Sequence, residues 1–153
     1  MEATVVEALN EAARKEQHTL DFYEKLLDIV AELSSKEIIK ELIETKKKFK
    51  SVIEEAITCD CLDNLGHDSS CKLRDLGIGK TGHSEVVTDS LNVQELLLIA
   101  IRHEDASMKY YESMAEKFKS SEAGEAFMRL AYDVACHKKD IQYIYDDIVN
   151  IEN

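Results

Sequence analysis

Residues 102–115 read RHEDASMKYYESMA, and they place one carboxylate on an apolar helical stripe. The apolar residues at spacings of three and four around Glu104 are Ala100, Ile101, Met108, Tyr111 and Ala115. Residues at these spacings share one face of a helix, so Glu104 would point into a core. An isolated buried charge is too costly, so this carboxylate must be paired, protonated or bound to a metal. The sequence therefore predicts a buried polar site around Glu104.

The composition is that of one helical domain. The chain has 153 residues, of which 44% are hydrophobic and 33% charged, and it contains no proline. A net charge of -12 argues against a nucleic-acid partner, whose phosphates would be repelled. No apolar run approaches the roughly 18 residues of a membrane-spanning helix, and the start of the sequence lacks the features of a signal peptide. We therefore expect a cytoplasmic protein without a membrane partner.

Apolar periodicity predicts four long helices in an all-α bundle of two antiparallel helical hairpins. The single domain would consist of hairpin 1 at about residues 4–57, a glycine-containing crossover at 58–91 and hairpin 2 at 92–150. Three pairs with capping-box spacing mark expected helix starts, and Gly124 marks the turn within the second hairpin. These pairs are Thr4 with Glu7, Ser34 with Glu37, and Asn92 with Glu95.

The two hairpins are related by an internal repeat. Shifting residues 9–57 by 88 positions aligns them with residues 97–145 and matches ten residues identically. The shift pairs Glu16 with Glu104, and it pairs Phe22-Tyr23 with Tyr110-Tyr111. Apolar periodicity alone would not give these polar and aromatic matches. Two hairpins packed about a pseudo-two-fold axis would bring Glu16 and Glu104 toward each other.

These motifs resemble the rubrerythrin branch of the ferritin-like superfamily. The resemblance rests on Glu16 with Phe22-Tyr23, on Glu104 with Tyr110-Tyr111, and on the segment LAYDVACH at residues 130–137. It implies a ferritin-like four-helix bundle with a di-iron or di-manganese site, peroxidase or oxidase activity on peroxide or oxygen, and a homodimer. The family's six ligand positions fall here on Glu16, Lys46, Phe49, Glu104, Val134 and His137. Only three of them are ligand types, and no Cys-x-x-Cys pair for a rubredoxin-like iron site is present.

Three hypotheses for the core follow. In the first, a reduced site holds Fe, Mn or Zn through Glu16, Glu104, Asp133 and His137. In the second, the site is metal-free, and the Lys46 ammonium pairs with one central glutamate while His137 hydrogen-bonds the other. In the third, a complete di-metal site uses shifted ligands such as Glu41, Glu44 or His18. In each case the hydroxyls of Tyr23 and Tyr111 are candidates to hydrogen-bond the central carboxylates.

The crossover is a second candidate site. Its Cys59, Cys61, His67 and Cys71 lie within thirteen residues, and this donor set could hold zinc or iron. The alternative is that the cysteines are redox-active thiols, or that Cys59 or Cys61 forms a disulfide with Cys71. Cys136 is expected to be a small packing residue.

The sequence leaves three functions open. The first is a ferritin-like metal-binding or redox-associated protein whose di-iron site is reduced or lost. The second is a peroxidase or oxidase of the rubrerythrin type, with an unidentified electron donor. The third is a metal-free structural or partner-binding bundle in which Lys46 supplies the charge of the metal.

Overall fold

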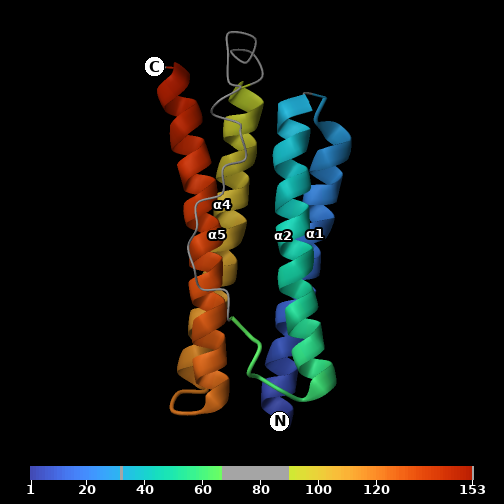
Figure 1. Ribbon diagram of the computed structural model, residues 1–153, viewed down its shortest axis with the longest axis vertical. Coiled ribbons are helices and arrows are strands. Elements are labelled where there is room, and N and C mark those ends of the chain that lie inside the picture. Colours follow the sequence, from blue (N-terminus) through green and yellow to red (C-terminus); the bar gives the residue numbers. More distant parts are fainter. Residues whose placement is uncertain (32, 67–89, 153) are drawn as a thin grey trace.

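The computed structural model describes residues 1–31, 33–66 and 90–152, and within these ranges the regular structure is entirely helical. The described ranges contain four helices: α1 (Ala3–Ile29), α2 (Leu33–Cys59), α4 (Ser90–Lys117) and α5 (Glu122–Glu152). They have the number and length that the apolar periodicity predicts. Helices of about 27 residues are roughly 40 Å long, which gives the molecule its elongated shape (Figure 1).

The helices form two antiparallel pairs. α1 packs mainly against α2, and α4 packs mainly against α5. In Figure 1 α1 and α5 run upward while α2 and α4 run downward, so α2 ends at the opposite end of the bundle from the start of α4. The end of α2 and the start of α4 are therefore separated by the length of the bundle.

The predicted helix start at Thr4 is wrong. α1 begins at Ala3, and its N-cap residue, Glu2, makes no side-chain capping bond, so Thr4 lies inside the helix. α2 begins at Leu33 and α4 at Ser90, within two residues of the predicted starts at Ser34 and Asn92.

The start of α5 is capped by a residue that the sequence analysis did not single out. Ser121 Oγ accepts a hydrogen bond from the Gly124 N–H at 3.2 Å, which is the bond of a serine N-cap. Gly124 therefore lies in the first turn of α5 and not in the preceding turn. A Cβ at this position would lie 2.4 Å from the carbonyl oxygen of Phe118, which explains why glycine is needed.

The interior consists of two apolar clusters. Helix residues of one end of the bundle form the first cluster, which includes Leu9, Ile53, Phe127 and Leu130; those of the other end form the second, which includes Ile38, Leu97 and Ile141. Of the four buried charged residues in the described ranges, Glu16, Lys46 and Glu104 lie between the clusters along the helices, and the fourth is Asp133 on α5. The bundle core is thus divided by a charged layer.

A short anchored loop follows α2. Leu65 is fully buried, and Arg129 of α5 donates from Nε to the Leu65 carbonyl at 2.6 Å and from Nη2 to the Leu62 carbonyl at 3.0 Å. Gly66 has φ 69°, and a Cβ there would lie 2.3 Å from the Cβ of Arg129. The loop is therefore fixed to the second helix pair by a close backbone approach that only glycine permits.

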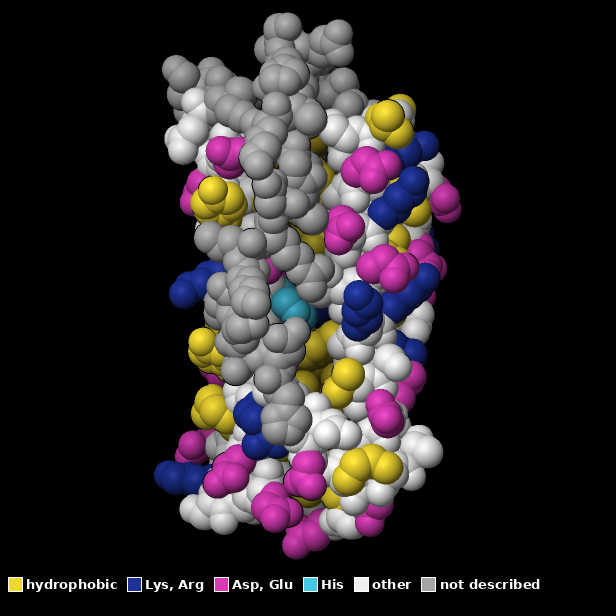
Figure 2. Space-filling model, in the orientation of Figure 1, with side chains coloured by type: hydrophobic (Ala, Val, Ile, Leu, Met, Phe, Trp, Pro, Cys, Tyr) yellow, Lys and Arg dark blue, Asp and Glu magenta, His cyan; other side chains and the backbone are white. Residues whose placement is uncertain are grey.

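Charged side chains of both signs are interspersed over the face of α2 that Figure 2 shows on the right. On α2, Lys47 and Lys48 are exposed, and Lys50 pairs with Glu54 at 2.6 Å. Lys46 departs from this solvated face, because it is buried. Among the described parts of the chain, no helix combines the length and apolar character needed to cross a membrane.

Candidate buried ion-pair site

Lys46 lies between the two central glutamates. Its Nζ is 2.9 Å from Glu16 Oε2 on α1 and 2.8 Å from Glu104 Oε2 on α4. The side chains of all three residues are at most 2% exposed. This arrangement answers what Glu104 faces: a lysine from α2 that is shared with Glu16. The ion pair that the metal-free hypothesis expects is present, and it involves both glutamates.

The two glutamates differ in their other partners. Glu16 Oε1 accepts hydrogen bonds from Ser107 Oγ at 2.6 Å and from the Tyr111 hydroxyl at 2.8 Å, and Oε2 accepts one from Lys46. Glu104 Oε2 lies 2.8 Å from the same Lys46 Nζ. The Glu16 carboxylate therefore accepts three hydrogen bonds from protein donors, which compensate for its removal from water.

The residues of α1 that correspond to Ser107 and Tyr111 do not donate equivalent hydrogen bonds to Glu104. At the 88-residue shift, Thr19 and Tyr23 correspond to Ser107 and Tyr111. Thr19 Oγ1 instead donates to the Lys15 carbonyl of its own helix at 3.3 Å. The Tyr23 hydroxyl is buried, and within the described ranges it has no hydrogen-bond partner. Local geometry thus breaks the symmetry that the sequence suggests.

The asymmetry separates the acidities of the glutamates. Burial opposes ionisation of Glu16, but Lys46 and the hydrogen bonds from Lys46, Ser107 and Tyr111 together lower its pKa. Burial raises the pKa of Glu104, and the charge of Glu16 adds to this effect, so the attraction of Lys46 is outweighed. Burial alone would lower the pKa of Lys46, yet Glu104 and Glu16 raise it. Lys46 is therefore a protonated cation that lies between a more acidic carboxyl group, Glu16, and a less acidic one, Glu104.

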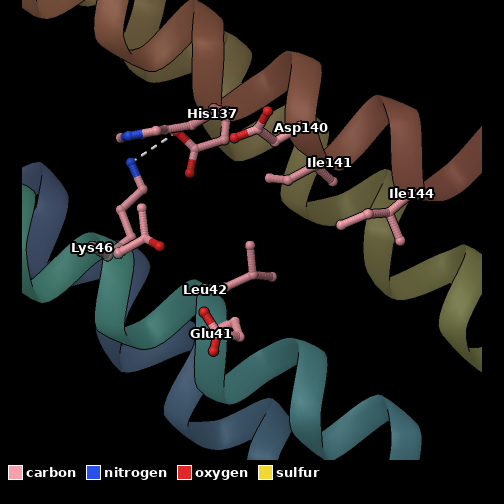
Figure 3. A pocket seen from close by; sticks show the side chains of 9 residues that line it. Glu41, Leu42, Lys46, His137, Asp140, Ile141 and Ile144 are labelled. Carbon is pink, nitrogen blue, oxygen red and sulfur yellow. Dashed lines mark ion pairs between the residues drawn. The ribbon is translucent and has the colours of Figure 1, made fainter. Parts of the chain in front are cut away.

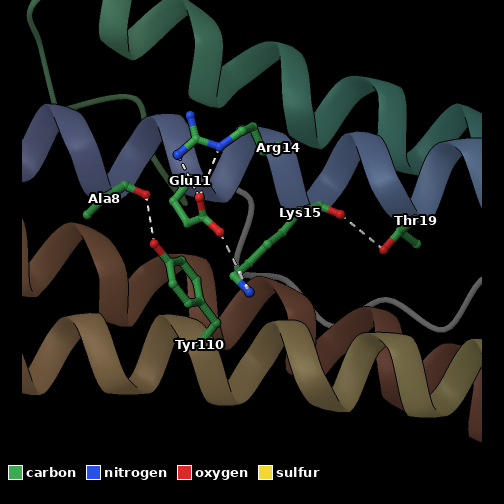
Figure 4. A network of polar contacts seen from close by, with 6 residues as sticks. All are labelled: Ala8, Glu11, Arg14, Lys15, Thr19 and Tyr110. Atoms are coloured by element: carbon green, nitrogen blue, oxygen red, sulfur yellow. Dashed lines mark hydrogen bonds and ion pairs between the residues drawn. The ribbon is translucent and has the colours of Figure 1, made fainter.

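The outer aromatic residue of each pair ties α1 to α4. The Tyr110 hydroxyl donates to the Ala8 carbonyl at 2.9 Å, and Lys15 Nζ lies 5.0 Å from the centre of its ring (Figure 4). Its counterpart Phe22 lies against His103, with ring centres 4.6 Å apart. Burial raises the pKa of Tyr110 to about 12 and lowers the pKa of His103. These contacts place the charged layer at the junction of the two helix pairs.

A pocket opens beside the charged layer, between α2 and α5. It has a volume of about 420 Å³, part of which is open solvent, and it reaches Lys46 and Glu104. Figure 3 shows Lys46 extending from α2 toward His137 on α5, with Asp140 one turn beyond. The remaining lining residues are Glu41, Leu42, Thr45, Ile141 and Ile144. His137 and Glu104 therefore line the same pocket.

The predicted metal ligands are brought together only in part. Glu16 and Glu104 meet at Lys46, His137 shares the pocket with Glu104, and Asp133 is buried one turn before His137 on α5. Of the shifted ligands, Glu41 lines the pocket, whereas Glu44 and His18 are exposed. In residues 1–31, 33–66 and 90–152, no group of three or more His, Cys, Asp or Glu side chains is arranged to hold a metal.

A di-metal site does not fit these residues as they are placed. The protonated Lys46 ammonium lies within 2.9 Å of both carboxylates, where a bridged metal pair would need those oxygens. Two other ligand positions implied by the family resemblance carry Val134 and Phe49, which are both buried in the apolar core. Neither side chain can donate to a metal.

The cysteine site has a different form from the predicted one. Cys59 and Cys61 form a disulfide with each other, so their sulfurs are not thiolate ligands in this state. The predicted partners His67 and Cys71 lie outside the described residues. Cys136 is buried on α5, but it is disulfide-bonded, so the expectation of a plain packing residue is wrong.

Ser107 is the site residue that the sequence analysis missed. The signal was its place three residues after Glu104, on the same helical face as Tyr111 four residues later.

Comparison with known protein families, with curated proteins and with solved structures finds no match for this chain.

Proposed function

We propose that this chain is a ferritin-like bundle of rubrerythrin type in which a Glu16–Lys46–Glu104 cluster has replaced the di-metal site. It acts as a structural or partner-binding protein and not as a peroxidase or oxidase. The observation that carries the proposal is the position of Lys46 Nζ, within 2.9 Å of both glutamates. One fixed ammonium supplies the positive charge that two facing carboxylates require.

The arrangement of the helices supports the ferritin-like part of the proposal. Two antiparallel pairs, with α2 and α4 running in the same direction, match a bundle of two hairpins joined by one long crossover. The charged layer lies where such a bundle would place its metal site, midway between two apolar clusters. The proposal places the protein in the cytoplasm.

The test is calorimetric titration with Fe²⁺ under anaerobic conditions and with Mn²⁺, followed by assay of peroxide consumption with a reductant. The native chain is expected to bind neither ion with Kd below about 100 μM and to leave peroxide unconsumed. The matched variant Lys46→Glu/Phe49→His/Val134→Glu restores the six ligand types and is expected to gain metal binding. Binding of two equivalents of metal by the native chain would overturn the proposal.

A second candidate is a single-metal site, and it is favoured by the pocket that His137 and Glu104 share. With Asp133 and Glu16, these residues would offer carboxylates and an imidazole, which suit Fe, Mn or Zn. Binding would require the Lys46 ammonium to leave Glu104. This candidate predicts one equivalent of Zn²⁺ bound by the native chain and lost in His137→Ala.

The partner in our proposal is a second copy of the chain, as the family resemblance implies. Three large apolar side chains on one side of α5 support such a contact: Met128, Tyr132 and Tyr143 are 51–55% exposed. Sedimentation analysis should detect a dimer that Tyr132→Lys weakens and that Lys47→Ala, an exposed control position on α2, leaves intact. A monomer at all concentrations would contradict this part.

A further inference from the structure

The end of α2 carries a disulfide within its helix cap. Cys59 is the last residue of the helix and is bonded to Cys61. Asp60 between them has φ 55°, and the Cys61 N–H donates to the Ala56 carbonyl at 3.1 Å. A left-handed residue followed by a bond back five positions is the Schellman cap, in which glycine is the usual left-handed residue. Here the disulfide spans an aspartate in that position.

The fold around the disulfide has its own anchors. Beyond the cap, buried Leu65 and the two hydrogen bonds from Arg129 hold the loop on α5. A disulfide that closes only three residues also constrains the unfolded chain much less than one that closes a long loop. Opening the bond would therefore leave the bundle folded, and the sulfurs are free to change oxidation state.

The sulfurs are within reach of a reactant. Cys59 is exposed and Cys61 is half-buried. They lie at the negative end of the α2 dipole, which disfavours a thiolate on the protein. The Asp60 side chain between them pairs with the N-terminal ammonium at 2.8 Å, so its charge is compensated. The helix dipole suits the site to a neutral dithiol or to a protein dithiol with positive charge beside its cysteine.

We propose that Cys59 and Cys61 form a thiol–disulfide exchange site that takes a dithiol as substrate. A substrate thiolate attacks Cys59 Sγ, the Cys59–Cys61 bond breaks, and Cys61 leaves as a thiolate that takes a proton from water. The second substrate thiolate attacks the mixed disulfide and releases Cys59, which is protonated in turn. Two electrons pass from the substrate, which becomes a disulfide, to the protein, which becomes a dithiol.

The test reduces the full chain without denaturant, using dithiothreitol or glutathione, and reoxidises it with oxidised dithiothreitol. Alkylation and fragment-ion mass spectrometry follow Cys59 and Cys61 individually, while circular dichroism follows the helices. Both sulfurs are expected to be labelled reversibly with the helical signal retained. At equal thiolate concentration, dithiothreitol should react at least about tenfold faster than glutathione, and added salt should narrow the gap.

Variants separate exchange from a merely structural bond. With oxidised glutathione, Cys61→Ser is expected to retain one glutathione on Cys59, whereas the native chain should expel it and reform its disulfide. Reduction that requires denaturant would overturn the proposal, as would native Cys59 and Cys61 that stay thiols in the presence of oxidised dithiothreitol. Neither result would bear on the Lys46 cluster, because the disulfide lies at the end of the bundle.

Discussion

Glu16 and Glu104 occupy equivalent positions in the repeat, yet their protein environments make them different acids. Glu16 gains hydrogen bonds from Ser107 and Tyr111, and Glu104 depends on Lys46 for its compensation. Two carboxylates facing one ammonium leave one negative charge without a partner cation. The lowered pKa of Glu16 and the raised pKa of Glu104 indicate that the charge of Glu104 is the less well compensated of the two.

This difference predicts opposite pH effects for a matched pair of variants. The folded-state pKa of Glu16 is below 4.5, so its stabilisation is present above pH 4.5 and is lost as the pH falls. The folded-state pKa of Glu104 is above 4.5, so its stabilisation is present below pH 4.5 and is lost as the pH rises. Urea unfolding of Glu16→Gln from pH 3 to 7 should therefore show a smaller loss of stability in acid. Glu104→Gln should remove the loss above pH 4.5.

The same slope of unfolding free energy against pH in both variants would show that the glutamates are equivalent acids, contrary to this account. Circular dichroism at each pH would verify that both variants remain helical before unfolding.

The two buried tyrosines give a second matched test at the scale of single residues. Tyr111→Phe removes a hydrogen bond to the Glu16 carboxylate and should cost about 1.5–3 kcal/mol of unfolding free energy. Tyr23→Phe removes a buried hydroxyl that has no hydrogen-bond partner within the described residues, so it should be neutral or slightly stabilising. Denaturant unfolding at pH 7 measures both, and equal losses would contradict the asymmetric site.

At the scale of elements, the helices carry two apolar clusters with a charged layer between them. Helical periodicity keeps Ala12, Glu16 and Leu20 on one face of α1, so the face changes from apolar to charged and back within three turns. The connections fix how the elements meet. The loop after α2 is held on α5 by Leu65, Gly66 and Arg129.

Gly66→Ala should therefore be strongly destabilising. Its Cβ would lie 2.3 Å from the Arg129 Cβ and 2.6 Å from the Arg129 carbonyl carbon, at a φ that alanine rarely adopts. We expect a loss of roughly 2–4 kcal/mol in unfolding free energy, compared with less than about 0.5 kcal/mol for the exposed neighbour Asn64→Ala. Equal stability of the two variants in a urea titration would refute the close approach.

At the scale of the whole molecule, the sequence was sufficient to predict four helices and a buried site around Glu104, because both follow from helical periodicity. The meeting of Glu16 with Glu104 was predictable from the repeat. The sequence left open whether Lys46 lies in the interior, since a lysine among three others also suits a solvated face. The roles of Ser107 and Gly66 depend on contacts between distant helices, and no local pattern specifies such contacts.

Lys46 links the two helix pairs, because it extends from α2 to a glutamate of its own pair and to one of the other. It is protonated more firmly in the folded state than in the unfolded chain. Its stabilisation is therefore complete below pH 10.5 and is lost as the pH rises through the folded-state pKa. The cluster acts as an ionic cross-link at the centre of the bundle.

The most direct test of this account is the unfolding free energy of Lys46→Met at pH 7, measured by urea titration beside the charge-free variant Glu16→Gln/Lys46→Met/Glu104→Gln. Lys46→Met leaves two buried carboxylates without their cation and should lose about 3–5 kcal/mol, most of which the triple variant should regain. Native stability in Lys46→Met would contradict the claim that Lys46 replaces the charge of a metal.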